Sequence, residues 1–286
     1  MDDDLRRLVQ ARLGLEVESI VRIERGWDST VFELNGEWIV RVPRRAEVRG
    51  WLRKEAALLP LLAPELPVPV PEVAAFEDTD ETFFLAYHKL PGEPLNGALQ
   101  VGGEAALAGE VGSFLAALHA FPGAARAGLR EITAADWLVE QEAFTVRCEK
   151  VLRLLDESER RRAEGMFARQ LSRSPDLELA LLHADLGAEH ILCRGETVTG
   201  VIDWSDARIG DPALDFAWLL HGVGEPFAQA LLSAYTERGG QVADGLRERA
   251  LDFHRLGPWH EVLHGLETNQ PELVSSGLAG VRKRLP

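Results

Sequence analysis

The chain has 286 residues, of which 46% are hydrophobic and 27% charged, as in a folded protein with a sizeable core. Its 31 Lys and Arg against 46 Asp and Glu give a formal net charge of −15, which argues against a nucleic-acid partner and favours a cationic one. The two cysteines, Cys148 and Cys193, indicate neither a disulfide framework nor a metal site. With no signal-peptide pattern at the acidic start and no apolar run of about 18 residues, the expected setting is the cytoplasm, without a membrane partner.

The first part of the chain reads as mostly β-structure with two helices. An amphipathic helix is expected at residues 3–13 and a second helix at 49–62. Strands are expected at Ile20–Ile23, Thr30–Leu34, Glu37–Val42, Val73–Phe76 and Thr82–Leu90. The dipeptide Asn35-Gly36 is the strongest short hairpin signal, and the proline-dense segment at 64–72 must be extended.

From residue 95 onward the pattern becomes helical. Several apolar residues share one helical face: Leu107, Val111, Phe114, Leu115 and Leu118. Further helices are expected at residues 133–156, 157–172, 212–221, 225–238, 242–265 and 270–283. A strand-rich segment at 180–203 interrupts them. The sequence therefore predicts an α+β protein with a small β-rich N-terminal lobe, residues 1–90, and a larger helical C-terminal lobe, residues 91–286.

The strand-rich segment holds the densest group of chemically active residues. One apolar run leads to Asp185 and a second leads to Asp203. The second run is expected to form a hairpin that turns at Arg194-Gly195-Glu196. A tight hairpin would bring His190 towards Asp203.

The spacing within this segment follows that of a kinase catalytic loop, H-R-D-x-x-x-x-N with a later D-F-G aspartate. Asp185 follows His183 at the second position, and His190 lies five residues further on. Asp203 lies 18 residues beyond Asp185. One carboxylate can orient an acceptor hydroxyl, while the second carboxylate and a further ligand hold Mg²⁺ on a triphosphate. The alternative is that both aspartates are strand-end turn residues, but the whole constellation favours catalysis.

Two stretches, HADLGAEHILC and GVIDWSDARIGDPALDF, resemble the aminoglycoside phosphotransferase family, and most closely its 2″-phosphotransferase branch, which also has His where other members have Asn. The resemblance implies a bilobal protein-kinase-like fold, with a nucleotide-binding N-terminal lobe and a C-terminal lobe that carries the catalytic loop and acceptor site. It implies Mg²⁺-dependent transfer of the γ-phosphate of ATP or GTP to a hydroxyl. Asp185 would be the catalytic base, and His190 and Asp203 the Mg²⁺ ligands. Because imidazole is an unusual Mg²⁺ ligand, the alternative for His190 is a hydrogen bond that only shapes the loop.

Two further aspartates follow in GDPALDF. Asp211 precedes Pro212 and is expected to cap a helix with proline in its first turn. Asp215 is expected to support the catalytic loop.

The resemblance also implies a nucleotide site in the N-terminal lobe. The turn around Gly26 would lie over the triphosphate, with Ser29 and Thr30 as phosphate contacts. The backbone around Tyr87 and His88, in a segment that resembles the interlobe linker, would hydrogen-bond the base.

Arg41 occupies the strand position where the kinase pattern has a lysine for the α/β-phosphates. Glu55 takes the position of the ion-pair glutamate, so an Arg41–Glu55 pair is expected. Arginine is not equivalent to lysine in phosphate binding, and this departure affects the pose of the triphosphate. The alternative is a surface Arg–Glu pair.

An aminoglycoside is a polycation, so the resemblance predicts an acceptor site rich in carboxylates. The candidates are Asp206, Glu261 and Glu267, of which Glu267 matches an acidic position of the 2″ branch. His260 falls where that branch has Glu and departs from it. The alternative is that these acids are solvated residues on a helix face.

The hypothesis is therefore a monomeric O-phosphotransferase for a small, cationic, hydroxyl-bearing molecule, in particular an aminoglycoside antibiotic. One alternative is a kinase of the same fold for another acceptor, such as a macrolide, an amino sugar or a choline-like metabolite. A second is a pseudokinase module that binds nucleotide without turnover, suggested by Arg41 and His190.

Overall fold

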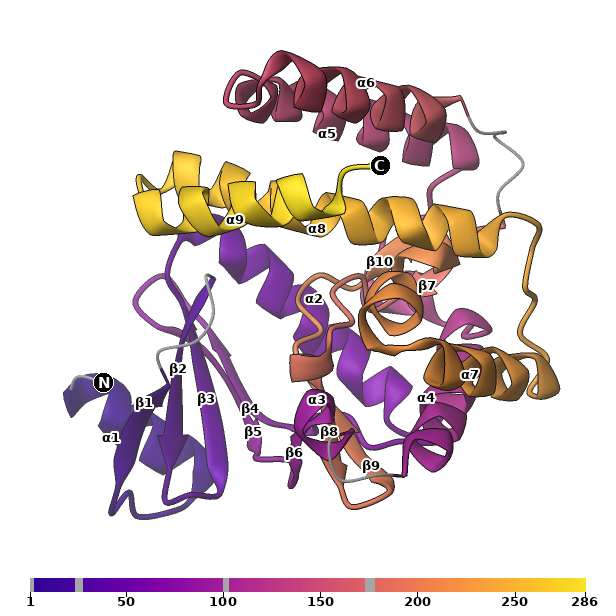
Figure 1. Ribbon diagram of the computed structural model, residues 1–286. Coiled ribbons are helices and arrows are strands. Elements are labelled where there is room, and N and C mark those ends of the chain that lie inside the picture. The colour runs from indigo at the N-terminus through magenta and orange to yellow at the C-terminus, as the bar shows by residue number, and fades with distance from the viewer. Residues whose placement is uncertain (1–2, 24–27, 100–102, 173–177) are drawn as a thin grey trace.

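The computed structural model describes residues 3–23, 28–99, 103–172 and 178–286 (Figure 1). Within them, a five-stranded antiparallel sheet in the order β1-β2-β3-β5-β4 forms one lobe. Its strands are Ile20–Ile23 (β1), Ser29–Leu34 (β2), Trp38–Pro43 (β3), Val73–Asp78 (β4) and Phe83–His88 (β5). Asn35 and Gly36 turn between β2 and β3 with φ angles of 53° and 74°, as the hairpin predicted from this dipeptide requires.

Helices cover both faces of this sheet: α1 (Asp3–Leu13) and α2 (Ala46–Leu62). Side chains alternate between the two faces along a strand. Val40 of β3 therefore packs in the cluster under α1, whereas Ile39 packs in the cluster under α2. Arg41, two residues beyond Ile39, also points towards α2, where it meets Glu55.

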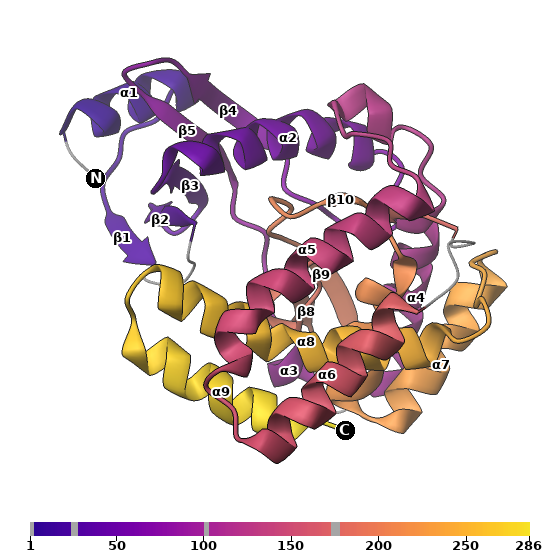
Figure 2. The ribbon, with the colours of Figure 1, turned by 90° about the horizontal axis from the view of Figure 1, so that it is seen from above.

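Helices make up most of the other lobe. They are α3 (Leu95–Ala98), α4 (Glu104–His119), α5 (Ala134–Leu152), α6 (Glu157–Leu171), α7 (Glu225–Glu237), α8 (Leu246–Glu267) and α9 (Pro271–Arg284). Both α5 and α6 begin at capping boxes, Thr133 with Asp136 and Asp156 with Glu159, which satisfy free N–H groups of the first turn. Seen from above, α5 and α6 lie over α8 (Figure 2). In the described ranges, no helix is both long and apolar enough to span a membrane.

The helix α2 ties the two lobes together. Leu52, in its first half, packs with residues of the sheet, while Leu58 and Leu59, in its second half, belong to the core of the helical lobe. Figure 1 shows α2 running from the sheet towards α4. Glu55 lies between these two halves and is therefore held at the junction of the lobes.

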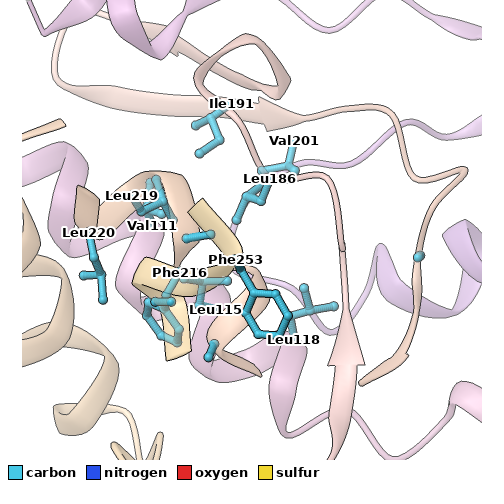
Figure 3. Close-up of a cluster of buried hydrophobic side chains, with 14 of the residues drawn as sticks. Val111, Leu115, Leu118, Leu186, Ile191, Val201, Phe216, Leu219, Leu220 and Phe253 are labelled. Atoms are coloured by element: carbon cyan, nitrogen blue, oxygen red, sulfur yellow. The ribbon is translucent and has the colours of Figure 1, made fainter. Parts of the chain in front are cut away.

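The predicted apolar face of α4 lies at the centre of the larger core. Its members are each at most 1% exposed: Leu107, Val111, Phe114, Leu115 and Leu118. The helical period read from the sequence is thereby confirmed. In Figure 3 the labelled α4 residues lie in the same cluster as Leu186 and Ile191, from the segment that holds the predicted catalytic residues. This core anchors that segment.

Short strands carry the predicted catalytic segment. They are β6 (Glu93–Pro94), β7 (Ala180–Leu182), β8 (Ile191–Arg194), β9 (Thr197–Val201) and β10 (Arg208–Gly210). β8 pairs with β6 and β9, and Gly195, with a φ of 59°, makes the hairpin turn that the sequence predicts. β7 pairs with β10. This pairing places the loop after β7, with Asp185, next to the segment before β10, with Asp203.

Residues 212–221 do not form the single helix that the sequence predicts. The structure has a 3₁₀ turn at Pro212–Leu214 and a π-helical segment at Leu219–Val223. Asp211 caps the turn by accepting the N–H of Ala213 at 3.0 Å, and it also accepts Nε of Arg249 on α8 at 2.7 Å. Asp215 binds the catalytic loop. Long-range contacts therefore override the local helical pattern.

His254 of α8 makes the native state sensitive to acid. It is half-buried and lies near Arg284 of α9, His221 of the π-helical segment and Arg255 of its own helix. Burial, reinforced by these neighbouring groups, lowers the pKa of His254 to about 4. The unfolded chain, with a histidine pKa near 6.5, therefore binds more protons between about pH 6.5 and pH 4. The free energy of unfolding falls as the pH falls through this window.

We expect His254→Gln to reduce this acid sensitivity. Glutamine keeps a polar side chain but takes up no proton, so the stability lost between pH 7 and pH 5 should be smaller by about 1 kcal/mol, a value reduced for partial exposure. Urea unfolding at both pH values measures the difference. Between pH 7 and pH 8 the two proteins should behave alike. Equal losses on acidification would contradict the prediction.

Candidate active site

The loop after β7 presents Asp185 from a strained turn. Ala184 has a φ of 70°, which a residue with a side chain rarely adopts. Asp215 holds this turn, because its carboxylate accepts the backbone N–H groups of His183 at 2.9 Å and Ala184 at 2.8 Å. His119 of α4 approaches the same carboxylate at 3.3 Å. Asp215 thus contacts the loop that the sequence analysis expects it to support.

His183 links this loop to the chain segment that carries Asp203. It is fully buried, and its Nε2 lies 2.9 Å from the carbonyl oxygen of Ile202. Because a carbonyl can only accept, Nε2 carries the proton, and Nδ1 accepts the backbone N–H of Asp185 at 3.3 Å. Burial, reinforced by His190, lowers the pKa of His183 to about 4. The ring is therefore a neutral, structural link.

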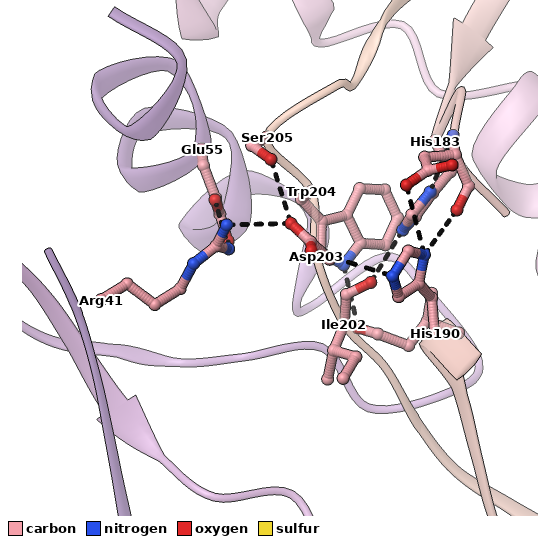
Figure 4. Close-up of polar contacts among 10 residues, drawn as sticks. Arg41, Glu55, His183, His190, Ile202, Asp203, Trp204 and Ser205 are labelled. Carbon is pink, nitrogen blue, oxygen red and sulfur yellow. Dashed lines mark hydrogen bonds and ion pairs between the residues drawn. The ribbon is translucent and has the colours of Figure 1, made fainter. Parts of the chain in front are cut away.

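His190 faces Asp203 (Figure 4), and it also lies beside Asp185. Its Nδ1 donates to the carbonyl oxygen of Asp185 at 2.6 Å, which leaves the lone pair of Nε2 available in the neutral ring. Nε2 lies 3.8 Å from Oδ2 of Asp203, so the hairpin brings these residues together as expected. Burial opposes protonation, but the carboxylates of Asp203 and Asp185 outweigh it and raise the pKa of His190. The position attracts positive charge.

Arg41 joins the two lobes through two carboxylates (Figure 4). Its Nη1 donates to both oxygens of Glu55, each at 2.9 Å, and its Nη2 donates to Oδ1 of Asp203 at 2.9 Å. Arg41 is 5% exposed and Glu55 is fully buried, so this is not a surface pair. Burial outweighs the attraction of Arg41 and raises the pKa of Glu55 to about 7. The carboxylate therefore depends on the guanidinium to stay ionised.

Asp203 is held in one orientation and one charge state. Its backbone φ is 66°, and the hydroxyl of Ser205 donates to its Oδ1 at 3.0 Å. Burial acts to raise its pKa, but Arg41 and His190 reverse this effect and hold the pKa of Asp203 well below its ordinary value. An ionised carboxylate is the form that binds a metal.

Asp203 and His190 offer two donors to a divalent cation. Among the residues that the structure describes, no group of three or more His, Cys, Asp or Glu could hold a metal by itself. Mg²⁺ is commonly bound by one or two carboxylates together with substrate phosphates and water. The donor set therefore fits an ion that arrives with a nucleotide.

The Asp185 carboxylate is the open group of this centre, with 58% of its side chain exposed. Partial desolvation, opposed by His190 and reinforced by Asp206 and Asp203, raises the pKa of Asp185 to about 6. Asp185 is more basic than an ordinary aspartate and still ionised at neutral pH.

The predicted phosphate contacts lie at the start of β2. Ser29 is 3% exposed, and its hydroxyl is buried with no hydrogen-bond partner in the described parts of the chain. Because buried hydroxyls usually have a partner, this group is available to a ligand. Thr30 is half-buried. Gly26 lies outside the described residues.

The predicted base contacts lie at the end of β5. Tyr87 pairs with Ile39 in the sheet and is 5% exposed. Burial outweighs the nearby Arg41 and raises the pKa of the Tyr87 hydroxyl. His88 is exposed, and its ring centroid lies 3.7 Å from that of Trp38. The Tyr87 side chain thus lies near the Arg41 ion pair, while that of His88 lies against Trp38 of β3.

The structure does not bring the three predicted acceptor residues together. Asp206 lies beside the catalytic centre, where desolvation and a neighbouring carboxylate raise its pKa. Glu267 pairs with Arg147 of α5 at 3.0 Å. Glu261 contacts a different neighbour, because it accepts the hydroxyl of Ser276 on α9 at 2.5 Å.

Sequence analysis missed the basic groups around Asp206. Lys54 of α2 lies close enough to Asp206 for the carboxylate to favour its charged form. Burial has the larger effect, however, and lowers the pKa of Lys54. Arg208 interacts with the same aspartate and pairs with Glu140 of α5 at 3.3 Å. One signal was available: Arg208 lies two residues after Asp206, and an extended segment would place both on one side.

His260 packs against an aromatic ring. It stacks on Phe144 of α5 with ring centroids 4.4 Å apart and planes 22° apart. Desolvation, reinforced by Arg147 and Arg208, lowers the pKa of His260, although part of the residue stays exposed. This face of the protein is therefore mixed in charge, with an aromatic patch, where the sequence analysis expects mainly carboxylates.

An Arg–Glu pair under a β-sheet, an aspartate on a loop anchored in a helical core and a second aspartate facing it are the parts of a kinase-like phosphotransferase. A model of the phosphotransferase enzyme family matches residues 19–251. The chain belongs to this family, and the family predicted from its two motifs is confirmed.

Known proteins show the same relationship. The chain is 32% identical over 252 residues to viomycin phosphotransferase from Streptomyces vinaceus, covering 85% of this chain and 82% of that one. It resembles the GDP and kanamycin complex of APH(2″)-IIIa, with a TM-score of 0.87 and 25% identity over 99% of this chain and 98% of that one. Macrolide 2′-phosphotransferase MphH from Brachybacterium faecium gives a TM-score of 0.76 and 27% identity over 98% of each chain. These likenesses confirm the bilobal, kinase-like α+β fold.

Proposed function

We propose that this phosphotransferase moves the γ-phosphate of ATP or GTP, with Mg²⁺, onto a hydroxyl of a small antibiotic. The observation that carries the proposal is the convergence of Asp185, His190 and Asp203. His190 Nδ1 lies 2.6 Å from the carbonyl oxygen of Asp185, and its Nε2 lies 3.8 Å from Asp203. The GDP complex of APH(2″)-IIIa, at 25% identity, supports a nucleotide donor.

Asp185 would orient the acceptor hydroxyl and accept its proton. Its carboxylate is open to an incoming acceptor, and a pKa raised to about 6 makes it a better base than an ordinary aspartate. Oδ2 of Asp203 and Nε2 of His190 would hold Mg²⁺, which when bound neutralises charge on the transferred phosphoryl group. The ordered loop fixes where the acceptor hydroxyl must lie.

Residues of the sheet lobe would bind the nucleotide. Ser29, with its buried and unpartnered hydroxyl, and Thr30 would donate to phosphate oxygens. Arg41, fixed by its partner on α2, would present its guanidinium to a phosphate in place of the usual lysine. The backbone around Tyr87 and His88 would hydrogen-bond the base.

Asp206 and Glu267 are the acceptor contacts in this proposal. One relative is named for viomycin, one related structure holds kanamycin, and another is a macrolide phosphotransferase. A cationic antibiotic fits the net charge of −15. Glu261 is left out, because its carboxylate turns to α9, where it accepts the hydroxyl of Ser276, whereas Glu267 lies on the side of α5, beside Arg147.

The test follows nucleoside diphosphate release from ATP or GTP with Mg²⁺ and a panel of acceptors: viomycin, kanamycin, a macrolide, an amino sugar and choline. Saturable release is expected with at least one antibiotic, and removal of Mg²⁺ with EDTA should abolish it. Release with only the amino sugar or choline would keep the phosphotransferase and overturn the antibiotic acceptor. Release with none would contradict the proposed acceptor class.

A further inference from the structure

A cavity of about 820 Å³ lies between the helical lobe and the two chain segments that connect the lobes. One wall comes from Pro67–Pro69, between α2 and β4, and from Leu90 and Pro91, which follow β5. The other walls come from α4, α7 and β9, which lie in the helical lobe (Figure 1). No residue of the proposed catalytic centre lines the cavity. Its volume is in the range of small-molecule sites.

Both connecting segments are fastened to β9. The N–H of Val201 donates to the carbonyl oxygen of Pro69 at 2.9 Å, and the hydroxyl of Thr199 donates to the carbonyl oxygen of Pro91. β9 ends two residues before Asp203. A molecule bound between these segments and β9 would therefore be able to change the angle between the lobes and the position of Asp203.

The cavity combines apolar walls with two carboxylates, Glu110 of α4 and Glu237 of α7. One oxygen of Glu110 accepts the N–H of Val198 at 2.6 Å, and one oxygen of Glu237 accepts the hydroxyl of Ser233 at 3.1 Å. Among the described residues, these hydrogen bonds are the contacts of the two carboxylates, and neither forms an ion pair with a basic side chain. Arg238 also lines the cavity and offsets one of the two negative charges. The net charge of the lining favours a cation.

We propose that this cavity binds a small organic cation, an amine with an apolar body, and that its binding changes the closure of the lobes over the nucleotide. The ammonium group pairs with Glu110 and Glu237, and the apolar body packs on the prolines of the connecting segments. Binding depends on the cavity alone, whereas the effect on nucleotide rests on the proposed function.

Two matched probes test the binding. 4-Phenylbutylamine and 4-phenylbutyrate have similar apolar bodies and opposite charges. Calorimetric titration without nucleotide or acceptor should show saturable binding of the amine only. In the double variant Glu110→Gln, Glu237→Gln, affinity for the amine should fall about tenfold or more, because two charge-assisted contacts are lost. Glutamine keeps an acceptor oxygen for the N–H of Val198 and for the hydroxyl of Ser233, so both substitutions preserve the local hydrogen bonds.

Cysteine labelling tests the location. Ala106 lines the cavity, whereas its neighbour Ala105 is exposed and does not line it. The native Cys148 and Cys193 are buried. 4-Phenylbutylamine should slow the reaction of Ala106→Cys with a methanethiosulfonate reagent and leave that of Ala105→Cys unchanged. Equal affinity for amine and carboxylate, unchanged affinity in the double glutamine variant, or equal labelling rates would overturn the site.

The coupling to the nucleotide is measured separately. Saturating amine should change the Kd of Mg²⁺-ATP or Mg²⁺-GTP about fivefold or more in the parent protein and should leave it unchanged in the double glutamine variant. If the amine binds and the nucleotide Kd does not move, the coupling is overturned. If neither nucleotide binds even without the amine, the proposed function fails while the result for the cavity stands.

Discussion

Replacing Asp185 by Asn is expected to lower turnover about 10³-fold while nucleotide affinity stays close to that of the parent. Asparagine has the shape of aspartate but cannot accept the proton of the acceptor hydroxyl. The loop should stay folded, because it is held by Asp215 through the backbone N–H groups of His183 and Ala184. The carboxylate of Asp185 is 58% exposed, so its loss leaves no buried group without a partner.

The measurement is kcat with the best acceptor, together with the Kd of the nucleotide. Glu189→Gln is a matched control, because Glu189 is an exposed carboxylate of the same loop, near enough to influence the pKa of Asp185, but with no proposed contact to the acceptor or the metal. It should change kcat little. Turnover of Asp185→Asn near that of the parent would show that another group acts as the base. Loss of nucleotide binding would show that the variant had disturbed more than the proton acceptor.

Local signals predicted those features that local chemistry determines. Asn35 and Gly36 both have positive φ, and few other residue pairs tolerate that turn. The apolar face of α4 needed only its spacing to be recognised. The meeting of His190 with Asp203 was predictable because a hairpin with a tight turn leaves the flanking residues little freedom.

Features that depend on distant partners were not predictable in the same way. Asp211 binds Arg249, 38 residues away, and Asp215 binds the N–H of His183, 32 residues away. These contacts divide the segment 212–221, whose composition favours one helix. No motif marks Arg249, so the sequence showed Asp211 but not its partner. Support of the catalytic loop by Asp215 was expected, but not that it acts through the backbone N–H groups of His183 and Ala184.

The sequence pattern alone could not predict how the candidate acceptor residues on α8 are arranged. Glu261 and Glu267 lie on the same helix, and periodicity does not reveal which side of α8 meets α9 and which meets α5. The structure pairs Glu261 with Ser276 of α9 and Glu267 with Arg147 of α5. Lys54 was not predicted as a site residue. On this helix the kinase pattern assigns a role only to its neighbour Glu55.

The pair predicted between Arg41 and Glu55 has a third member. Arg41 also binds Asp203, 162 residues away in the chain. The sequence could predict the pair because its members occupy known kinase positions. The bridge to Asp203 depends on the closure of the two lobes, which no local pattern contains. Arg41 is therefore the residue whose loss should affect both stability and activity most.

Replacing Arg41 by Met is expected to lower the free energy of unfolding by about 3–5 kcal/mol, because it leaves the buried carboxylate of Glu55 without its cation. Burial raises the pKa of Glu55 even with Arg41 present, so in the variant this group must either stay ionised without a partner or take up a proton, and both cost stability. Turnover should fall as well, because the proposed phosphate contact is lost and Asp203 loses a hydrogen bond. Urea unfolding and kcat measure the two effects.

A set of variants distinguishes the effect of losing the Arg41–Glu55 ion pair from the effect of losing an arginine side chain alone. Arg41→Met with Glu55→Gln should recover part of the stability, because no uncompensated buried charge remains. Arg41→Lys keeps the charge but not the forked geometry, so its loss should be intermediate. Arg53→Met is the matched control, because Arg53 also lies on α2 and pairs with Asp78 but is 53% exposed. A loss for Arg41→Met no larger than that for Arg53→Met would mean that the buried bridge does not stabilise the junction of the lobes.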